Sequence, residues 1–240
     1  MVEDLTRHTR GGRTAGRPVP AVPPPSARAW LGPIAVLAAL VVAGLGVLYA
    51  GDSGPGAVDA RVWAAVDGAG PVWRRVALAT DFLGEPVGAA ALICVTVAGC
   101  LVRRTPRAAV LVVAGAGLTV GTTRLLKSLV GRTIHGEDNL SYPSGHTAFL
   151  TAFALVLALL ATGRLGLGRV AGTSLVFGAG LAAGGAMGWA QVALGAHYPT
   201  DAVGGWCTAL AVVPATAWLV DRTADRLGGR PAGAGRREWG

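Results

Sequence analysis

Long runs of apolar residues, separated by short polar segments, dominate the chain between residues 29 and 221. As a helix, the first run, residues 29–50, is long enough to cross roughly 30 Å of hydrocarbon, and it is longer than the apolar part of a signal peptide. Five further runs follow, at residues 84–102, 108–126, 146–162, 170–192 and 201–220. The pattern predicts an all-α, polytopic membrane protein with six transmembrane helices.

Polar segments divide the chain into a membrane domain and two tails. Residues 1–28 are rich in arginine, proline and glycine and have no regular apolar period, which is typical of a disordered segment. Residues 222–240 form a second basic tail, so the six-helix domain is expected to cover residues 29–221. Residues 51–83 mix polar and apolar positions, and a short interfacial helix is expected near residues 62–66.

The composition agrees with a membrane protein, because 52% of the residues are hydrophobic and only 14% are charged. A formal net charge of +8 is compatible with nucleic-acid binding. The arginines, however, flank the apolar runs and do not form one patch, so no nucleic-acid partner is expected. The three cysteines lie inside apolar runs, at a spacing that suits neither a metal site nor a disulfide framework: Cys94, Cys100 and Cys207.

The distribution of basic residues predicts how the helices are oriented. With six spans, fifteen of the 21 lysine and arginine residues fall on the side that carries both termini. The positive-inside rule places that side in the cytoplasm. The loop before the fourth span and the loop before the sixth span are then expected on the extracytoplasmic face of the cell membrane.

The loop before the fourth span contains the sequence Pro-Ser-Gly-His at residues 143–146. Pro143 disfavours helix in the residue before it, and Ser144 is a good helix N-cap. The turn therefore opens a helix whose unpaired N–H groups and dipole favour an anion. By itself, the turn is equally compatible with a plain helix cap.

The loop before the sixth span contributes His197 and, four residues later, Asp201. A carboxylate that binds one imidazole nitrogen fixes the tautomer and leaves the other nitrogen as a nucleophile. Lys127 and Arg132 can supply positive charge for phosphate oxygens. His146 can protonate a leaving oxygen, so these residues together predict phosphoryl-transfer chemistry.

Three motifs in this order resemble the type 2 phosphatidic acid phosphatase family, which shares its active-site pattern with the vanadium haloperoxidases. The family's Pro-Ser-Gly-His motif is intact as residues 143–146. Its third motif is retained at residues 194–195 and from His197 to Asp201, and its first motif at Lys127 and at residues 131–132. Over roughly residues 81–220, the resemblance implies a six-helix membrane core.

The resemblance also implies a lipid phosphatase that uses no metal or other cofactor. His197 would attack phosphorus to form a phosphohistidine, Asp201 would orient it, and His146 would protonate the departing lipid oxygen. The implied substrate is a phosphomonoester or diphosphate of a lipid in the bilayer, such as phosphatidic acid or a polyprenyl diphosphate. The implied phosphate-binding residues are Lys127, Arg132, Ser144, Gly145 and Gln191.

Two of the motifs depart from the family pattern. The Ser-Arg of the third motif is Ala190-Gln191 here, and the Arg-Pro that closes the first motif falls on Ile134-His135. Losing a charge-assisted contact costs on the order of 1.5–3 kcal/mol, or about tenfold to a hundredfold in rate. An active phosphatase is therefore one hypothesis, and an impaired relative that binds or moves a lipid phosphate is the alternative. A vanadium-dependent peroxidase ranks third, because those enzymes are usually soluble.

Overall fold

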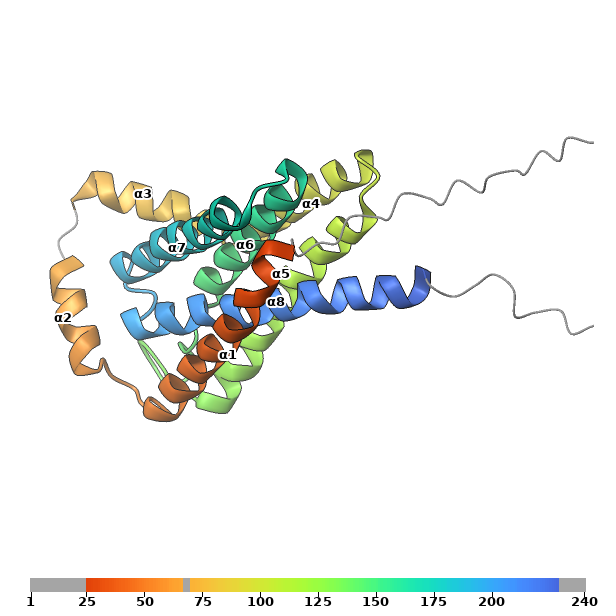
Figure 1. Ribbon diagram of the computed structural model, residues 1–240. Helices are drawn as coiled ribbons and strands as arrows, with labels where there is room; N and C mark the ends of the chain where they lie inside the picture. Colours follow the sequence, from red (N-terminus) through yellow and green to blue (C-terminus); the bar gives the residue numbers. More distant parts are fainter. Residues whose placement is uncertain (1–24, 67–69, 229–240) are drawn as a thin grey trace, which may run out of the picture.

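The computed structural model describes residues 25–66 and 70–228, which form helices joined by short connections (Figure 1). Among these residues, the β-structure is an isolated antiparallel bridge between Thr133 and Leu140. The predicted all-α class is confirmed. The helices are α1 (Pro25–Leu48), α2 (Ala57–Val66), α3 (Pro71–Phe82), α4 (Pro86–Val102), α5 (Pro106–Val130), α6 (Gly145–Leu165), α7 (Arg169–Ala193) and α8 (Pro199–Gly228).

Five of the described helices are long and apolar enough to cross a membrane, namely α1, α5, α6, α7 and α8. The second span expected from the sequence corresponds to α4, which has 17 residues. It passes the same test only together with α3, from which it is bent by 56°. The predicted polytopic architecture is confirmed, with six spans when this bent pair is counted as one.

The segment between the first two spans is more helical than its sequence predicts. The expected short helix near residues 62–66 is present but begins earlier, at Ala57. Helix α3 is not predicted, because Arg74 and Arg75 interrupt its apolar pattern. The N-terminal tail expected at residues 1–28 lies largely outside the described residues, as does the end of the C-terminal tail. Helix α8 continues seven residues past residue 221, the expected end of the membrane domain.

Helices α6 and α8 form the inner part of the bundle. In the most apolar 18-residue stretch of each of these two helices, 56% is buried inside the protein, whereas in the corresponding stretch of α1 the share is 17%. Helix α6 packs against α5, α7 and α8. Close packing depends on small residues of α7. A Cβ at Gly184 would lie 2.2 Å from the ring of Trp206, whose indole N–H donates to the carbonyl of Gly180 at 3.0 Å.

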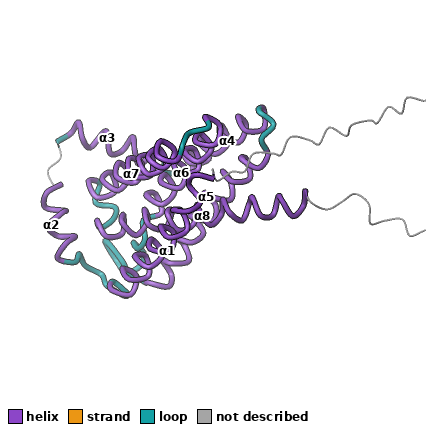
Figure 2. The backbone as a smooth tube through the Cα atoms, in the orientation of Figure 1, coloured by secondary structure: helices purple, strands orange, loops and turns teal. Residues whose placement is uncertain are grey.

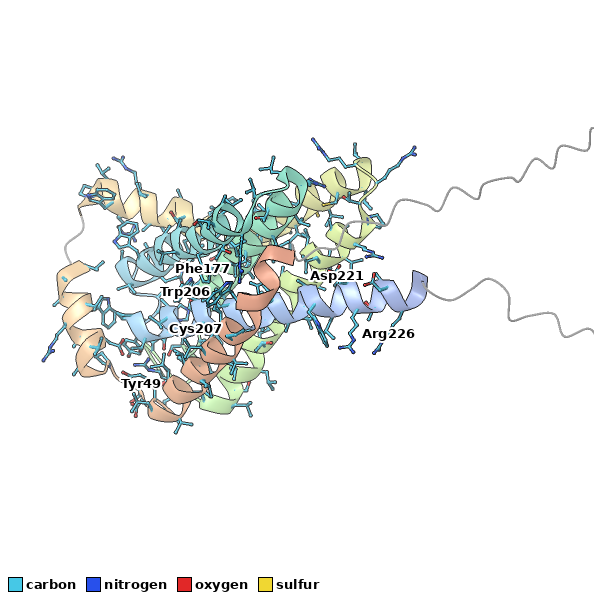
Figure 3. The ribbon with its side chains drawn as sticks, viewed as in Figure 1. Tyr49, Phe177, Trp206, Cys207, Asp221 and Arg226 are labelled. Carbon is cyan, nitrogen blue, oxygen red and sulfur yellow. The ribbon has the colours of Figure 1, made fainter. Side chains whose placement is uncertain are left out.

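The loops before α6 and α8 lie at the same end of the bundle (Figure 2). The loop before α6 also touches the first turn of α8, because the backbone N–H of Ser144 donates to the carbonyl of Asp201 at 2.9 Å. Figure 3 places Tyr49 at this end of the molecule and Asp221 and Arg226 at the other. The two loops that carry the predicted site residues therefore share one face of the protein.

The side of the membrane on which this face lies stays a prediction from the charges, and cysteine labelling tests it. In a cysteine-free background, Asp138→Cys should react with an impermeant maleimide in intact cells, because Asp138 is exposed in the loop before α6. Leu165→Cys, exposed at the opposite end of α6, should react only after permeabilisation. The reverse pattern would contradict the expected orientation.

Candidate active site

Helix α6 begins at Gly145, within the Pro-Ser-Gly-His motif and one residue before the predicted start. Ser144 is its N-cap, and the hydroxyl oxygen accepts a hydrogen bond from the backbone N–H of Thr147 at 3.3 Å. Two glycines of α8 let this turn approach closely. A Cβ at Gly205 would lie 2.3 Å from the Ser144 carbonyl, and one at Gly204 would lie 2.5 Å from the ring of Tyr142. The N-terminus of α6 is thereby held against the start of α8.

His197 and Asp201 lie together at the start of α8, and both are buried. The Nδ1 atom of His197 is 3.5 Å from the Oδ2 atom of Asp201, which also accepts from the backbone N–H of Tyr198 at 3.1 Å. This separation is longer than a formed hydrogen bond, and catalytic contacts commonly tighten when substrate binds. The carboxylate faces Nδ1, which leaves Nε2 as the nitrogen able to attack.

The environment favours the neutral form of His197. Burial lowers the pKa of His197 from its ordinary value of 6.5 and outweighs the opposite effect of the Asp201 carboxylate, while the positive charge of Lys127 lowers it further. A neutral imidazole retains the lone pair that a nucleophile needs.

Arg132, which the resemblance implies as a phosphate-binding residue, forms ion pairs with two carboxylates. Its side chain has no exposed surface; Nη1 is 2.7 Å from Oδ1 of Asp201, and Nη2 is 2.7 Å from Oδ2 of Asp59. The rings of Tyr49 and Tyr198 lie on the guanidinium, at 4.0 and 4.3 Å. Sequence reasoning missed Asp59 and Tyr49, because neither belongs to a motif. An acidic residue within a short, largely apolar helix was the available signal for Asp59.

Lys127 lies at the end of α5, half-buried, with its ammonium group directed at the loop before α6. The ammonium donates to the carbonyls of Leu140 and Ser141, the latter at 3.2 Å. An ammonium group has three N–H donors, so one remains for a ligand.

Gln191 and His146 both face Asp81, and His146 also faces Glu85; neither acidic residue was predicted to belong to the site. The Gln191 amide donates to Oδ1 of Asp81 at 2.5 Å. The Nε2 atom of His146 lies 3.7 Å from carboxylate oxygens of both Asp81 and Glu85. Asp81, Glu85 and His146 offer ligand atoms that all lie within 4.8 Å of one another. Among the residues that the structure describes, this is the group that could hold a metal ion.

The positions at which the family has Arg-Pro serve packing and loop contacts. Ile134 is 2% exposed and fills the interior. His135 has a φ of 59° and forms a 2.7 Å hydrogen bond between its Nε2 atom and the carbonyl of Gly195. The two loops are thus joined at His135, where the family pattern has proline, and the position of the family's arginine is filled by the buried Ile134.

These features define a class: a multi-pass helical membrane protein with a buried histidine–aspartate pair beside the N-terminus of a neighbouring helix. The sequence profile of the PAP2 superfamily matches residues 87–225, more than half of the chain, and the protein belongs to this superfamily. It is similar in fold to the crystal structure of the first transmembrane PAP2-type phosphatidylglycerolphosphate phosphatase from Bacillus subtilis. That match has a TM-score of 0.56 and 21% identity, and it covers 82% of this chain and 96% of the other. The sequence matches no curated protein.

The Arg132 network predicts a large effect on stability. Arg132→Met leaves Asp59 and Asp201 buried without a cation, which should cost about 3–5 kcal/mol, or about 6–20 °C in the thermal unfolding midpoint for a chain of this size. The control is Arg124→Met, because Arg124 is exposed on α5, the helix that precedes Arg132. Equal unfolding midpoints for the two variants in detergent would contradict the assignment.

Proposed function

We propose that this protein hydrolyses a phosphomonoester or diphosphate of a lipid on the extracytoplasmic face of the cell membrane. The observation that carries the proposal is the buried His197–Asp201 pair, held against the N-terminus of α6 and its His146. Membership of the PAP2 superfamily supports it. The fold relative from Bacillus subtilis is itself described as a phosphatidylglycerolphosphate phosphatase.

In the proposed reaction, Nε2 of His197 attacks phosphorus while the bond to the leaving oxygen breaks. Asp201 holds the Nδ1 proton and stabilises the positive charge that develops on the imidazole. His146 gives its proton to the departing oxygen. Water then attacks the phosphohistidine, with His146 taking a proton from it, and inorganic phosphate leaves.

Positive charge and N–H donors around the phosphate come from two elements. The free N–H of Lys127 is one source, and the N-terminus of α6 is the other. The amides of Gly145 and His146 precede the first intrahelical hydrogen bond, from Ala148 to the carbonyl of Ser144, so they can bind equatorial oxygens. Ser144 itself shapes the turn, because its amide donates to Asp201 and its hydroxyl caps the helix.

An apolar groove beside the site suits the hydrocarbon part of a lipid. It has a volume of about 330 Å³ and lies between α2, α7 and α8. Its lining includes Pro199, two residues after His197, so we infer that a chain that occupies it carries its phosphate at the loops. Its walls include Val62, Val66, Leu181, Gly188, Trp189, Val192, Ala202 and Val203.

We expect the reaction to need no metal ion, because Lys127 and the α6 N-terminus supply the electrostatic stabilisation. Purified protein in detergent should release phosphate from at least one member of a panel of phosphatidic acid, phosphatidylglycerol phosphate and polyprenyl diphosphate, with or without a chelator. His197→Ala should abolish release, since no nucleophile remains. The control is His8→Ala, at a residue outside the described part of the chain.

Activity that survives His197→Ala would overturn the assigned nucleophile. Activity lost on chelation and restored by a divalent cation would overturn metal independence and would direct attention to Asp81, Glu85 and His146.

One observation favours the second candidate, an impaired relative that binds or moves a lipid phosphate. Gln191 stands where the family has arginine, and its amide is already engaged by Asp81. If the missing charge limits turnover, Gln191→Arg should raise kcat/KM by about tenfold to a hundredfold, because it adds a charge-assisted contact.

Gln191→Met, which keeps the volume and removes the donor, is the matched control for this comparison. Robust wild-type turnover that Gln191→Arg does not increase would contradict the impaired alternative and would leave the active phosphatase.

A further inference from the structure

Asp59 lies outside residues 87–225, the segment that matches the PAP2 superfamily, but its side chain is buried in the site. It lies in the first turn of α2 and has no exposed side-chain surface. Its Oδ2 atom accepts from Arg132 at 2.7 Å and from the hydroxyl of Thr200 at 3.0 Å. Its Oδ1 atom accepts from the backbone N–H of Thr200 at 2.9 Å. One carboxylate thus binds both the buried guanidinium and the start of α8.

The two terminal nitrogens of the Arg132 guanidinium bind different carboxylates. Nη2 binds Asp59, and Nη1 binds Oδ1 of Asp201 and the hydroxyl of Thr200, the last at 2.6 Å. The other oxygen of Asp201, Oδ2, therefore stays beside Nδ1 of His197. The contact between Asp201 and His197 depends on Arg132 taking one oxygen only.

An arginine with a single carboxylate partner prefers to bind both of its oxygens through two parallel hydrogen bonds. Without Asp59, Nη2 of Arg132 would be released from α2 and could turn to Oδ2 of Asp201. That oxygen would then be shared with the guanidinium and would bind Nδ1 of His197 less strongly. The charge on Asp59 prevents this rearrangement by holding Nη2.

We propose that Asp59 is a positioning residue for the reaction: by holding Arg132, it keeps Oδ2 of Asp201 aligned with His197. It acts through Arg132 and Asp201 and does not touch the phosphate. Helix α2, which precedes the family-matched segment, thereby completes the active site. The role in turnover rests on the proposed phosphatase function, whereas the effect on the His197 imidazole does not.

The test compares Asp59→Asn with Asp52→Asn in the full-length protein in detergent. Asn has the shape of Asp and keeps an acceptor for Thr200, but it lacks the charge that holds Arg132. Asp52 is exposed just before α2, so its variant is the control. With ¹⁵N-labelled histidine, only four side chains give signals, and single substitutions assign them. The ring nitrogen shifts report which nitrogen of His197 carries the proton.

We expect Asp59→Asn to reduce the Nδ1–H tautomer of His197 and to lower kcat about tenfold or more, with KM changed less than threefold. Asp52→Asn should match wild type in both measurements. A change in KM alone, or a folded Asp59→Asn protein with wild-type ring nitrogen shifts, would overturn the proposal. If Asp59→Asn does not fold, Asp59→Glu is measured in its place, since the longer side chain keeps the charge but displaces the guanidinium. Ring nitrogen shifts equal to those of wild type in Asp59→Glu would also overturn the proposal.

These measurements separate the two claims. If the wild-type protein releases no phosphate from any lipid, the proposed function fails, and the ring nitrogen shifts still decide whether Asp59 controls the His197–Asp201 contact. If wild type is active and Asp59→Asn is equally active with unchanged shifts, the positioning role alone fails.

Discussion

Burial of the Arg132 guanidinium is the constraint on which this end of the molecule depends. Taking a charge out of water costs several kcal/mol unless it is well paired, and here two carboxylates and two tyrosine rings surround it. Those partners come from the residue after α1, from α2 and from the start of α8, while Arg132 follows α5. These elements, which are far apart in the sequence, must therefore meet at Arg132, and the loop that carries His197 lies at the same place.

This arrangement leaves the site with little positive charge that is free to bind a ligand. Arg132 is neutralised by its partners, Gln191 carries no charge, and Asp81 and Glu85 add negative charge beside His146. In the proposed function, Lys127 and the N-terminus of α6 are left to attract the phosphate. Electrostatic stabilisation is usually the largest contribution in phosphoryl transfer, so the proposed reaction depends heavily on how these few groups are positioned.

Much of the fold can be predicted from the sequence, because a span of the bilayer needs about twenty apolar residues whatever its neighbours are. All six runs follow from that rule. What the rule did not give is that the second run forms a 17-residue helix, α4, which passes the spanning test only together with α3, whose apolar pattern Arg74 and Arg75 interrupt. The Ser144 cap was equally predictable, because an N-cap depends on residues within one turn.

The sequence by itself determined the helices, the turn before α6 and the pair of histidine motifs, since all of these depend on local spacing and hydrophobicity. Tertiary structure alone decided what each charged residue touches. Arg132 and Asp59 are 73 positions apart, and Gln191 and Asp81 are 110 apart, so no local pattern connects them. A buried charge must find a partner, but which partner depends on how the helices pack, and for this reason Asp59 emerged only from the folded protein.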